Sequence, residues 1–194
     1  MTVATLERPD WDRLYEVAAA QEGYFTTHQA AEAGYSPQLL VHHLASGRAT
    51  RVRRGVYRLV HFPAGEHEDL VMLWLWSDRA GVFSHETALT LHHLSDALPV
   101  QHDLTLPEAW RPRRFRVPEG LLLHYADIPK KDRTWFGAVP VTSVRQTLRD
   151  CAADGIAPDL VRQAAKQALR RGLVARAELD EVRASLRAFG GLSA

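Results

Sequence analysis

The sequence has one cysteine, Cys151, and no long apolar run, and each absence removes a class of protein. A single thiol excludes an internal disulfide framework and a cysteine-rich zinc site. Apolar stretches such as 71–76 are far shorter than the ~20 residues that a membrane-spanning helix needs. The first ten residues carry Glu7, Arg8 and Asp10 where a secretory signal would be apolar. We therefore expect a cytoplasmic protein with no membrane partner.

An excess of charge of one sign is also lacking, because the net charge is +1 over 194 residues. The distribution is nevertheless uneven, since residues 33–65 contain no acidic side chain. That stretch carries arginine alone among the charged types, at Arg48, Arg51, Arg53, Arg54 and Arg58. Arginine without neighbouring acids is typical of a surface that contacts phosphates. A solvated arginine hairpin without a ligand is the alternative.

The first sixty residues predict three helices followed by a pair of strands. The pattern favours helices at 10–21, 26–33 and 36–46, and two short strands within 50–59. Ser36 before Pro37 marks the start of the third helix, because serine caps free amides and proline fits the first turn. Gly34 supplies the tight turn before it. This order is typical of a winged helix-turn-helix, so we predict a DNA-binding domain over residues 1–64.

The third predicted helix has one apolar and one polar face. Leu40 and Leu44 lie four residues apart, so we expect them to face the core. The opposite face offers polar side chains suited to a major groove, and the helix start favours a backbone phosphate. The candidate DNA-binding residues are Ser36, Gln38, His42, Arg48, Arg51, Arg53, Arg54 and Arg58.

Residues 65–194 predict a second domain of mixed α/β order that ends in helices. A short linker with proline and glycine, 61–65, precedes it. Helices are expected at 66–78, 84–94, 143–153, 158–171 and 175–188, and strands at 102–106, 121–126 and 138–141. The predicted fold class is α+β, with domains at 1–64 and 65–194.

Ten histidines raise the question of a metal or catalytic site in this second domain. His85 and His92 share a helix face, but zinc on a helix usually takes histidines four apart with a third ligand nearby. Ser84 fits a helix cap better than a nucleophile, because no glycine-flanked serine turn surrounds it. Two histidine–aspartate pairs near strand ends, His102 with Asp103 and His124 with Asp127, could serve acid–base chemistry. We expect no metal, no cofactor and no catalytic residue; a DNA-targeted hydrolase or nuclease is the alternative.

A basic stripe lies on the helix predicted at 158–171. Arg162, Lys166 and Arg170 stand four residues apart, opposite an apolar face. The stripe is a candidate partner-binding surface for an acidic protein or for nucleic acid. A solvated helix face is the equal alternative.

Several short segments, taken in order, resemble AbiEi-family antitoxins. They are Gly23–Thr27, Ala30–Gly34, Leu44–Arg48, Arg53–Leu59, Phe83–Leu89 and Pro140–Asp150. The resemblance covers nearly the whole chain, and the order of the segments is more specific than any one of them. Val144 departs from the pattern, which often has a proline or a small polar residue there.

The resemblance implies a repressor and antitoxin of a toxin–antitoxin pair, of the kind involved in abortive infection and phage defence. Its N-terminal domain would bind double-stranded DNA at inverted repeats in its own promoter. Its C-terminal domain would counter a nucleotidyltransferase-like toxin, directly or indirectly, without being an enzyme. A transcription regulator whose C-terminal domain senses a ligand is the alternative among binding proteins.

Overall fold

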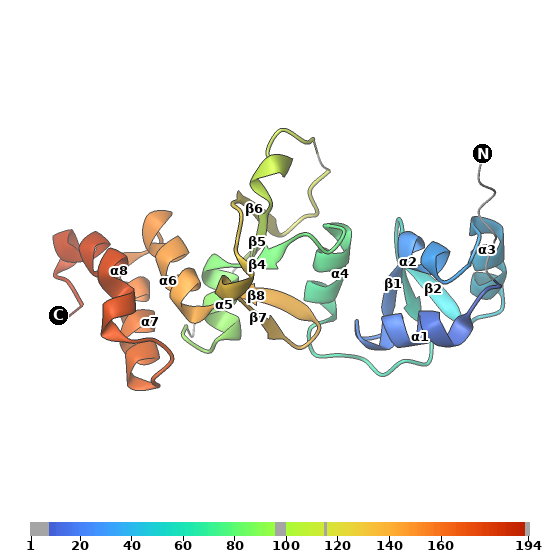
Figure 1. Cartoon of the computed structure of the whole chain (residues 1–194), viewed down its shortest axis with the longest axis horizontal. Coiled ribbons are helices and arrows are strands. Elements are labelled where there is room, and N and C mark those ends of the chain that lie inside the picture. Colours follow the sequence, from blue (N-terminus) through green and yellow to red (C-terminus); the bar gives the residue numbers. More distant parts are fainter. Residues whose placement is uncertain (1–7, 96–99, 115, 193–194) are drawn as a thin grey trace. The chain divides into compact units, whose positions relative to one another are not determined.

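The computed structural model describes residues 8–95, 100–114 and 116–192. The chain divides into two compact units, Met1–Arg79 and Ala80–Ala194 (Figure 1). The sequence places the boundary after residue 64, and the units divide later than that. The reason is helix α4, Glu68–Trp76, which contacts strands of the first unit instead of opening the second.

Three helices of the first unit form where their caps predict them. They are α1 (Trp11–Ala19), α2 (Thr27–Glu32) and α3 (Pro37–Ala45). The caps Asp10, Thr26 and Ser36 each accept a hydrogen bond from the backbone amide three residues later. Gly34 has a φ of 83°, a left-handed conformation that suits glycine and turns the chain from α2 into α3.

A small antiparallel sheet completes this unit. Its strands are β1 (Tyr24–Thr26), β2 (Ala49–Arg53) and β3 (Val56–Leu59), with β3 between the other two. The predicted hairpin over 50–59 is therefore confirmed, whereas β1 was not predicted. The core between helices and sheet contains Leu14, Ala18, Phe25, Ala30, Leu40 and Leu59. Three helices followed by a hairpin make this unit a winged helix-turn-helix.

The second unit contains a mixed sheet in the order β6-β5-β4-β8-β7. Its strands are β4 (Val82–Phe83), β5 (His102–Leu106), β6 (Leu121–Tyr125), β7 (Arg133–Phe136) and β8 (Val139–Thr142). The pairs β5–β6 and β4–β8 are parallel, and β4–β5 and β7–β8 are antiparallel. The strands predicted at 102–106, 121–126 and 138–141 are confirmed, and β4 and β7 were not predicted.

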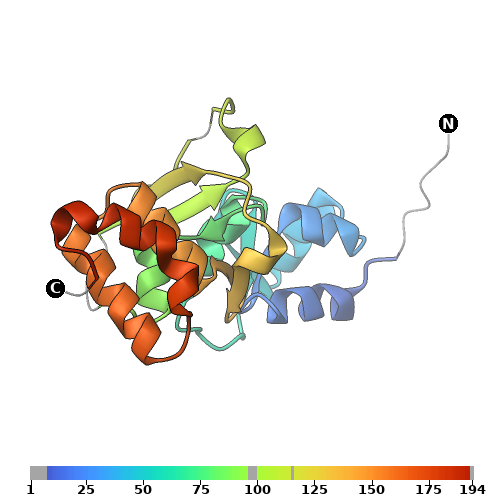
Figure 2. The ribbon, with the colours of Figure 1, turned by 60° about the vertical axis from the view of Figure 1, so that its left-hand side comes forward.

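The second unit also contains α-helices. They are α5 (His85–Leu91), α6 (Val144–Ala153), α7 (Pro158–Arg170) and α8 (Asp180–Ser185), the last three of which lie together in Figure 2. Their shared core includes Leu148, Val161, Ala164, Ala168 and Val182. The helix predicted over 175–188 is instead broken into Arg176–Leu179, α8 and Arg187–Phe189. Within the described residues, every helix falls short of the length and apolarity needed to cross a membrane.

Candidate nucleic-acid interface

Helix α3 presents the polar face that the sequence predicts. Gln38 and His42 are exposed, whereas Leu40 on the opposite face is buried. Val41 lies beside Gln38 on the exposed side, with 62% of its surface accessible. The sequence interpretation missed Val41 because it belongs to an apolar run. An exposed valine on a recognition helix suits contact with a thymine methyl group in the major groove.

Ser36 holds the start of α3 in place. Its side-chain Oγ accepts a hydrogen bond of 3.2 Å from the backbone amide of Leu39. The hydroxyl therefore orients the helix start, where free amides favour a phosphate oxygen. Ser36 is exposed, so a phosphate can approach it.

The hairpin places exposed arginines beside this helix. Arg51, Arg53 and Arg54 are exposed on β2 and the turn after it, and β2 is an edge strand that contacts α3. Arg48 precedes β2 and is also exposed, with its guanidinium over the Trp11 ring at 5.5 Å. The four side chains and the exposed face of α3 thus belong to neighbouring elements. Cations beside a recognition helix are what phosphate contacts require.

Arg58 is a correction to the predicted set. Its guanidinium forms an ion pair of 2.8 Å with Glu68 and also donates to the carbonyl of Phe62. Only 17% of the Arg58 side chain is exposed, so it is engaged inside the unit and not offered to DNA. Its positive charge alone suggested a phosphate contact, because Glu68 lay in a segment assigned to the other domain.

Glu68 is held in its charged form by three donors. Burial would raise its pKa, but hydrogen bonds from Tyr24, the backbone of Gly65 and Arg58 outweigh burial and lower it. The Tyr24 hydroxyl donates to Glu68 at 2.9 Å, and burial together with this bond raises the pKa of Tyr24 to about 12. Glu68, with Tyr24 and Arg58, therefore fixes helix α4 to strands β1 and β3. We call these three side chains the anchor.

His43 sits behind the exposed face of α3. Its ring stacks on Trp11 with centroids 5.1 Å apart and meets Tyr35 edge-on. Burial lowers the pKa of His43, and the nearby charges of Arg48 and His42 lower it further. His43 therefore packs as a neutral ring, which leaves His42 as the histidine of this helix that can reach a base.

The unit that carries this exposed face matches a known protein family. Residues 12–60 match the family model of the AbiEi antitoxin transcriptional regulators. The matched range runs from α1 through β3 and includes the exposed face of α3 and the arginine hairpin. The AbiEi resemblance drawn from the sequence is confirmed there.

Two other comparisons concern the chain as a whole. The crystal structure of the RV2827C protein from Mycobacterium tuberculosis is similar with a TM-score of 0.45 and 14% identity, over 94% of this chain and 78% of that one. No curated protein matches this chain.

The predicted basic stripe on α7 is only partly present. Arg162 donates to the backbone carbonyl of Gly191 and forms an ion pair with Asp159, with 14% of its side chain exposed. Its predicted exposure to a partner is therefore wrong. Lys166 and Arg170 instead line a cavity of about 330 Å³ together with two further cations, Arg176 and Arg183. The sequence interpretation missed these two because they follow the end of α7.

The helix histidines of the second unit separate. His92 Nε2 donates to the carbonyl of Thr142 at 2.8 Å, and burial lowers the pKa of His92. His85 contacts other residues, so this pair forms no joint site. Ser84 occupies the N-cap position of α5, but its side chain makes no capping bond and is fully buried. The predicted capping hydrogen bond is thus wrong, and burial also keeps Ser84 from acting as an accessible nucleophile.

Proposed function

We propose that this chain is a cytoplasmic DNA-binding antitoxin that represses its own operon. The observation that carries the proposal is the AbiEi family match over residues 12–60, on a unit whose recognition helix and arginine hairpin are exposed together. Both features fit a duplex: the helix enters the major groove and the arginines meet phosphates.

The residues of α3 and the arginines have different proposed roles on DNA, which follow from their side-chain chemistry. Gln38 has an amide that can bond an adenine edge with two hydrogen bonds, and His42 and Val41 flank it on the same face. Arg48, Arg51, Arg53 and Arg54 carry the sequence-independent affinity. Inverted repeats in the chain's own promoter are the proposed target, read by two copies of the unit, one on each half-site.

The second unit is the proposed antitoxin half, and it acts without catalysis. We assign to it the neutralisation of a nucleotidyltransferase-like toxin, in a system that halts phage spread. The cavity lined by Lys166, Arg170, Arg176 and Arg183 supports a surface for an acidic partner, because four cations gather there.

Co-expression with the neighbouring toxin gene under an unrelated promoter tests the proposal. The unaltered chain should restore growth and repress a reporter fused to its own promoter. The Arg53→Ala/Arg54→Ala variant should restore growth but lose repression, because the two units do different work. Arg113→Ala/Arg114→Ala is the matched control, since it removes an exposed pair of adjacent arginines from the second unit.

Failure of the unaltered chain to restore growth would contradict the antitoxin assignment. Loss of growth rescue in Arg53→Ala/Arg54→Ala, while the control variant still rescues growth, would mean that neutralisation runs through DNA binding. Unchanged repression in Arg53→Ala/Arg54→Ala would contradict the arginine hairpin as the phosphate-binding element.

A further inference from the structure

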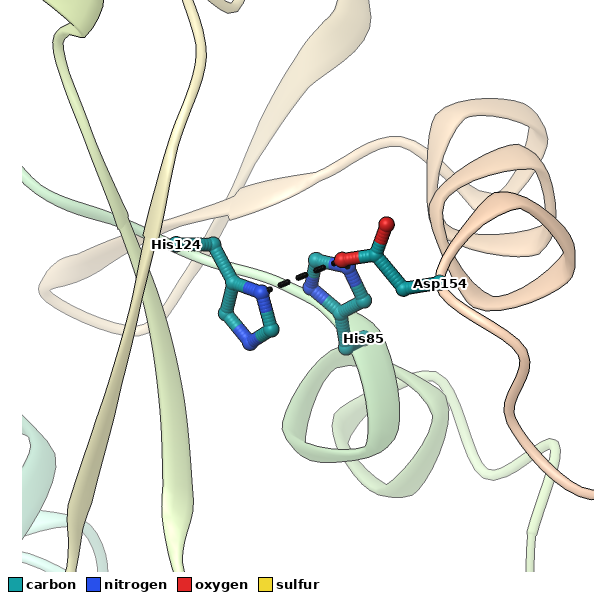
Figure 3. Close-up of side chains that lie close together, drawn as sticks. All are labelled: His85, His124 and Asp154. Atoms are coloured by element: carbon teal, nitrogen blue, oxygen red, sulfur yellow. Dashed lines mark hydrogen bonds and ion pairs between the residues drawn. The ribbon is translucent and has the colours of Figure 1, made fainter.

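Three side chains from distant parts of the second unit converge on one point. His85 begins α5, His124 lies on β6 and Asp154 follows α6 (Figure 3). His85 Nε2 lies 3.1 Å and His124 Nδ1 lies 3.3 Å from the same carboxylate oxygen of Asp154. All three donor atoms lie within 4.8 Å of one another.

The outer nitrogen of each histidine is already held. His124 Nε2 bonds the Asp103 carboxylate at 2.8 Å, and His85 Nδ1 bonds the hydroxyl of Ser84 at 2.9 Å. Histidines that bind metals nearly always direct their other ring nitrogen to such a partner, which fixes the tautomer and aims the first nitrogen at the ion. Each ring therefore has one nitrogen held by a partner, as in a metal-binding histidine, and its other nitrogen points at Asp154.

We propose that His85, His124 and Asp154 bind a divalent transition-metal ion of the zinc class. Two imidazoles and one carboxylate form a donor set that suits zinc, whereas magnesium and calcium take oxygen ligands. Ligands of a tetrahedral zinc at ~2.0–2.2 Å stand roughly 3.3–3.5 Å from each other. The two distances to Asp154 are close to that spacing.

Binding the ion requires the two rings to turn relative to each other. The His85 and His124 rings are stacked, with centroids 3.7 Å apart and planes inclined by 16°. Each nitrogen lone pair lies in its ring plane, so a shared ion turns the rings away from parallel. Asp154 follows the last turn of α6 and is half-exposed, which leaves its carboxylate room to adjust.

The site is open to solvent on one side. A cavity of about 360 Å³ is lined by all three ligands, with Arg111 and Asp150 also on its wall. This gives the ion an entry path and leaves a fourth coordination position for water or a small ligand. Sequence spacing could not reveal the site, because its ligands come from three separate elements.

Zinc titration of the full-length, chelator-stripped protein tests the proposal. We expect calorimetry to show one zinc per chain at this site and no magnesium binding. Cobalt should bind the same site and give a visible absorption band. Zinc should also raise the melting temperature, because an ion that binds the native state stabilises it.

Variants locate the ion. Asp154→Asn and His124→Gln should remove the binding and the thermal shift. Asp103→Asn, which alters the outer partner of His124 and also the acceptor of the Thr87 amide, should weaken zinc binding by about 10–100-fold. Asp159→Asn and His61→Gln, two exposed residues outside the cluster, should bind zinc like the unaltered chain.

Two results would overturn the proposal. One is the absence of a single zinc equivalent in the unaltered protein, which would leave the cluster as hydrogen bonds alone. The other is unchanged zinc affinity in both Asp154→Asn and His124→Gln, which would place the ion on other histidines. Neither result bears on DNA binding, so the proposed function is tested separately.

Discussion

Arg58 on strand β3 and Glu68 on helix α4 form an ion pair of 2.8 Å that joins the hairpin to the segment after it. Tyr24 on β1 donates to the same carboxylate at 2.9 Å, and its ring lies 5.6 Å from the Arg58 guanidinium. Strands β1 and β3 and helix α4 thus meet at one charged anchor. This contact explains why the first unit extends beyond the hairpin.

Removing Arg58 should destabilise the first unit without changing phosphate contacts. Arg58→Ala removes one of the three donors to Glu68, and a hydrogen bond to a charged group contributes about 1.5–3 kcal/mol. Urea unfolding should therefore show a lower midpoint for Arg58→Ala, with the salt dependence of DNA binding unchanged. An unaltered midpoint together with weaker DNA binding would mean that Arg58 contacts DNA.

Acid should weaken this anchor in a defined direction. The folded-state pKa of Glu68 lies below its ordinary value of 4.5, so its contribution is present above that pH and is lost as pH falls through the lowered pKa. Glu68→Gln should lose that part of the acid dependence of the unfolding midpoint. Equal acid dependence in both proteins would contradict the anchor.

Alkaline pH should also weaken the anchor, through ionisation of Tyr24. The pKa of Tyr24 is raised from 10.0 to about 12, so its contribution is present below pH 10.0 and is lost as pH rises toward 12. Tyr24→Phe should unfold with less sensitivity over that alkaline range, measured by the same urea midpoints. Equal alkaline sensitivity in Tyr24→Phe and the unaltered chain would mean that folding does not raise the pKa of Tyr24.

Sequence preference should depend on the exposed face of α3. Gln38→Ala or His42→Ala should reduce discrimination between operator bases by about 1–3 kcal/mol for each lost base contact. Affinity for unrelated duplexes should stay nearly unchanged, because the arginines supply it. Fluorescence anisotropy against operator variants measures both quantities. Uniform weakening on all sequences would contradict base readout by these residues.

Local signals predicted the helix-turn-helix well. Ser36 and Pro37 mark the start of α3 by capping and ring geometry, and Gly34 supplies the turn that the chain needs there. Strand β1 was missed because three residues leading directly into α2 show no alternation. The final helix was predicted as continuous because no glycine or proline marks the breaks between Arg176–Leu179, α8 and Arg187–Phe189.

Contacts between residues that are far apart in the sequence could not be predicted from it. The charge of Arg58 indicated a phosphate contact, and only its placement beside Glu68 shows a structural role. The cluster of His85, His124 and Asp154 likewise has no spacing in the sequence, because strand pairing and helix packing bring its members together. Exposure of Arg53 and Arg54 followed from the turn itself, so it was predictable.

The salt dependence of DNA binding tests the central claim most directly. Arg48, Arg51, Arg53 and Arg54 are exposed around α3, and four phosphate contacts give a log–log slope of about −3.6 per bound chain. Arg53→Ala/Arg54→Ala should bring the slope to about −1.8 on every duplex, while Arg113→Ala/Arg114→Ala leaves it unchanged. A slope that is the same in Arg53→Ala/Arg54→Ala and the unaltered chain would contradict the winged helix-turn-helix as the DNA-binding surface.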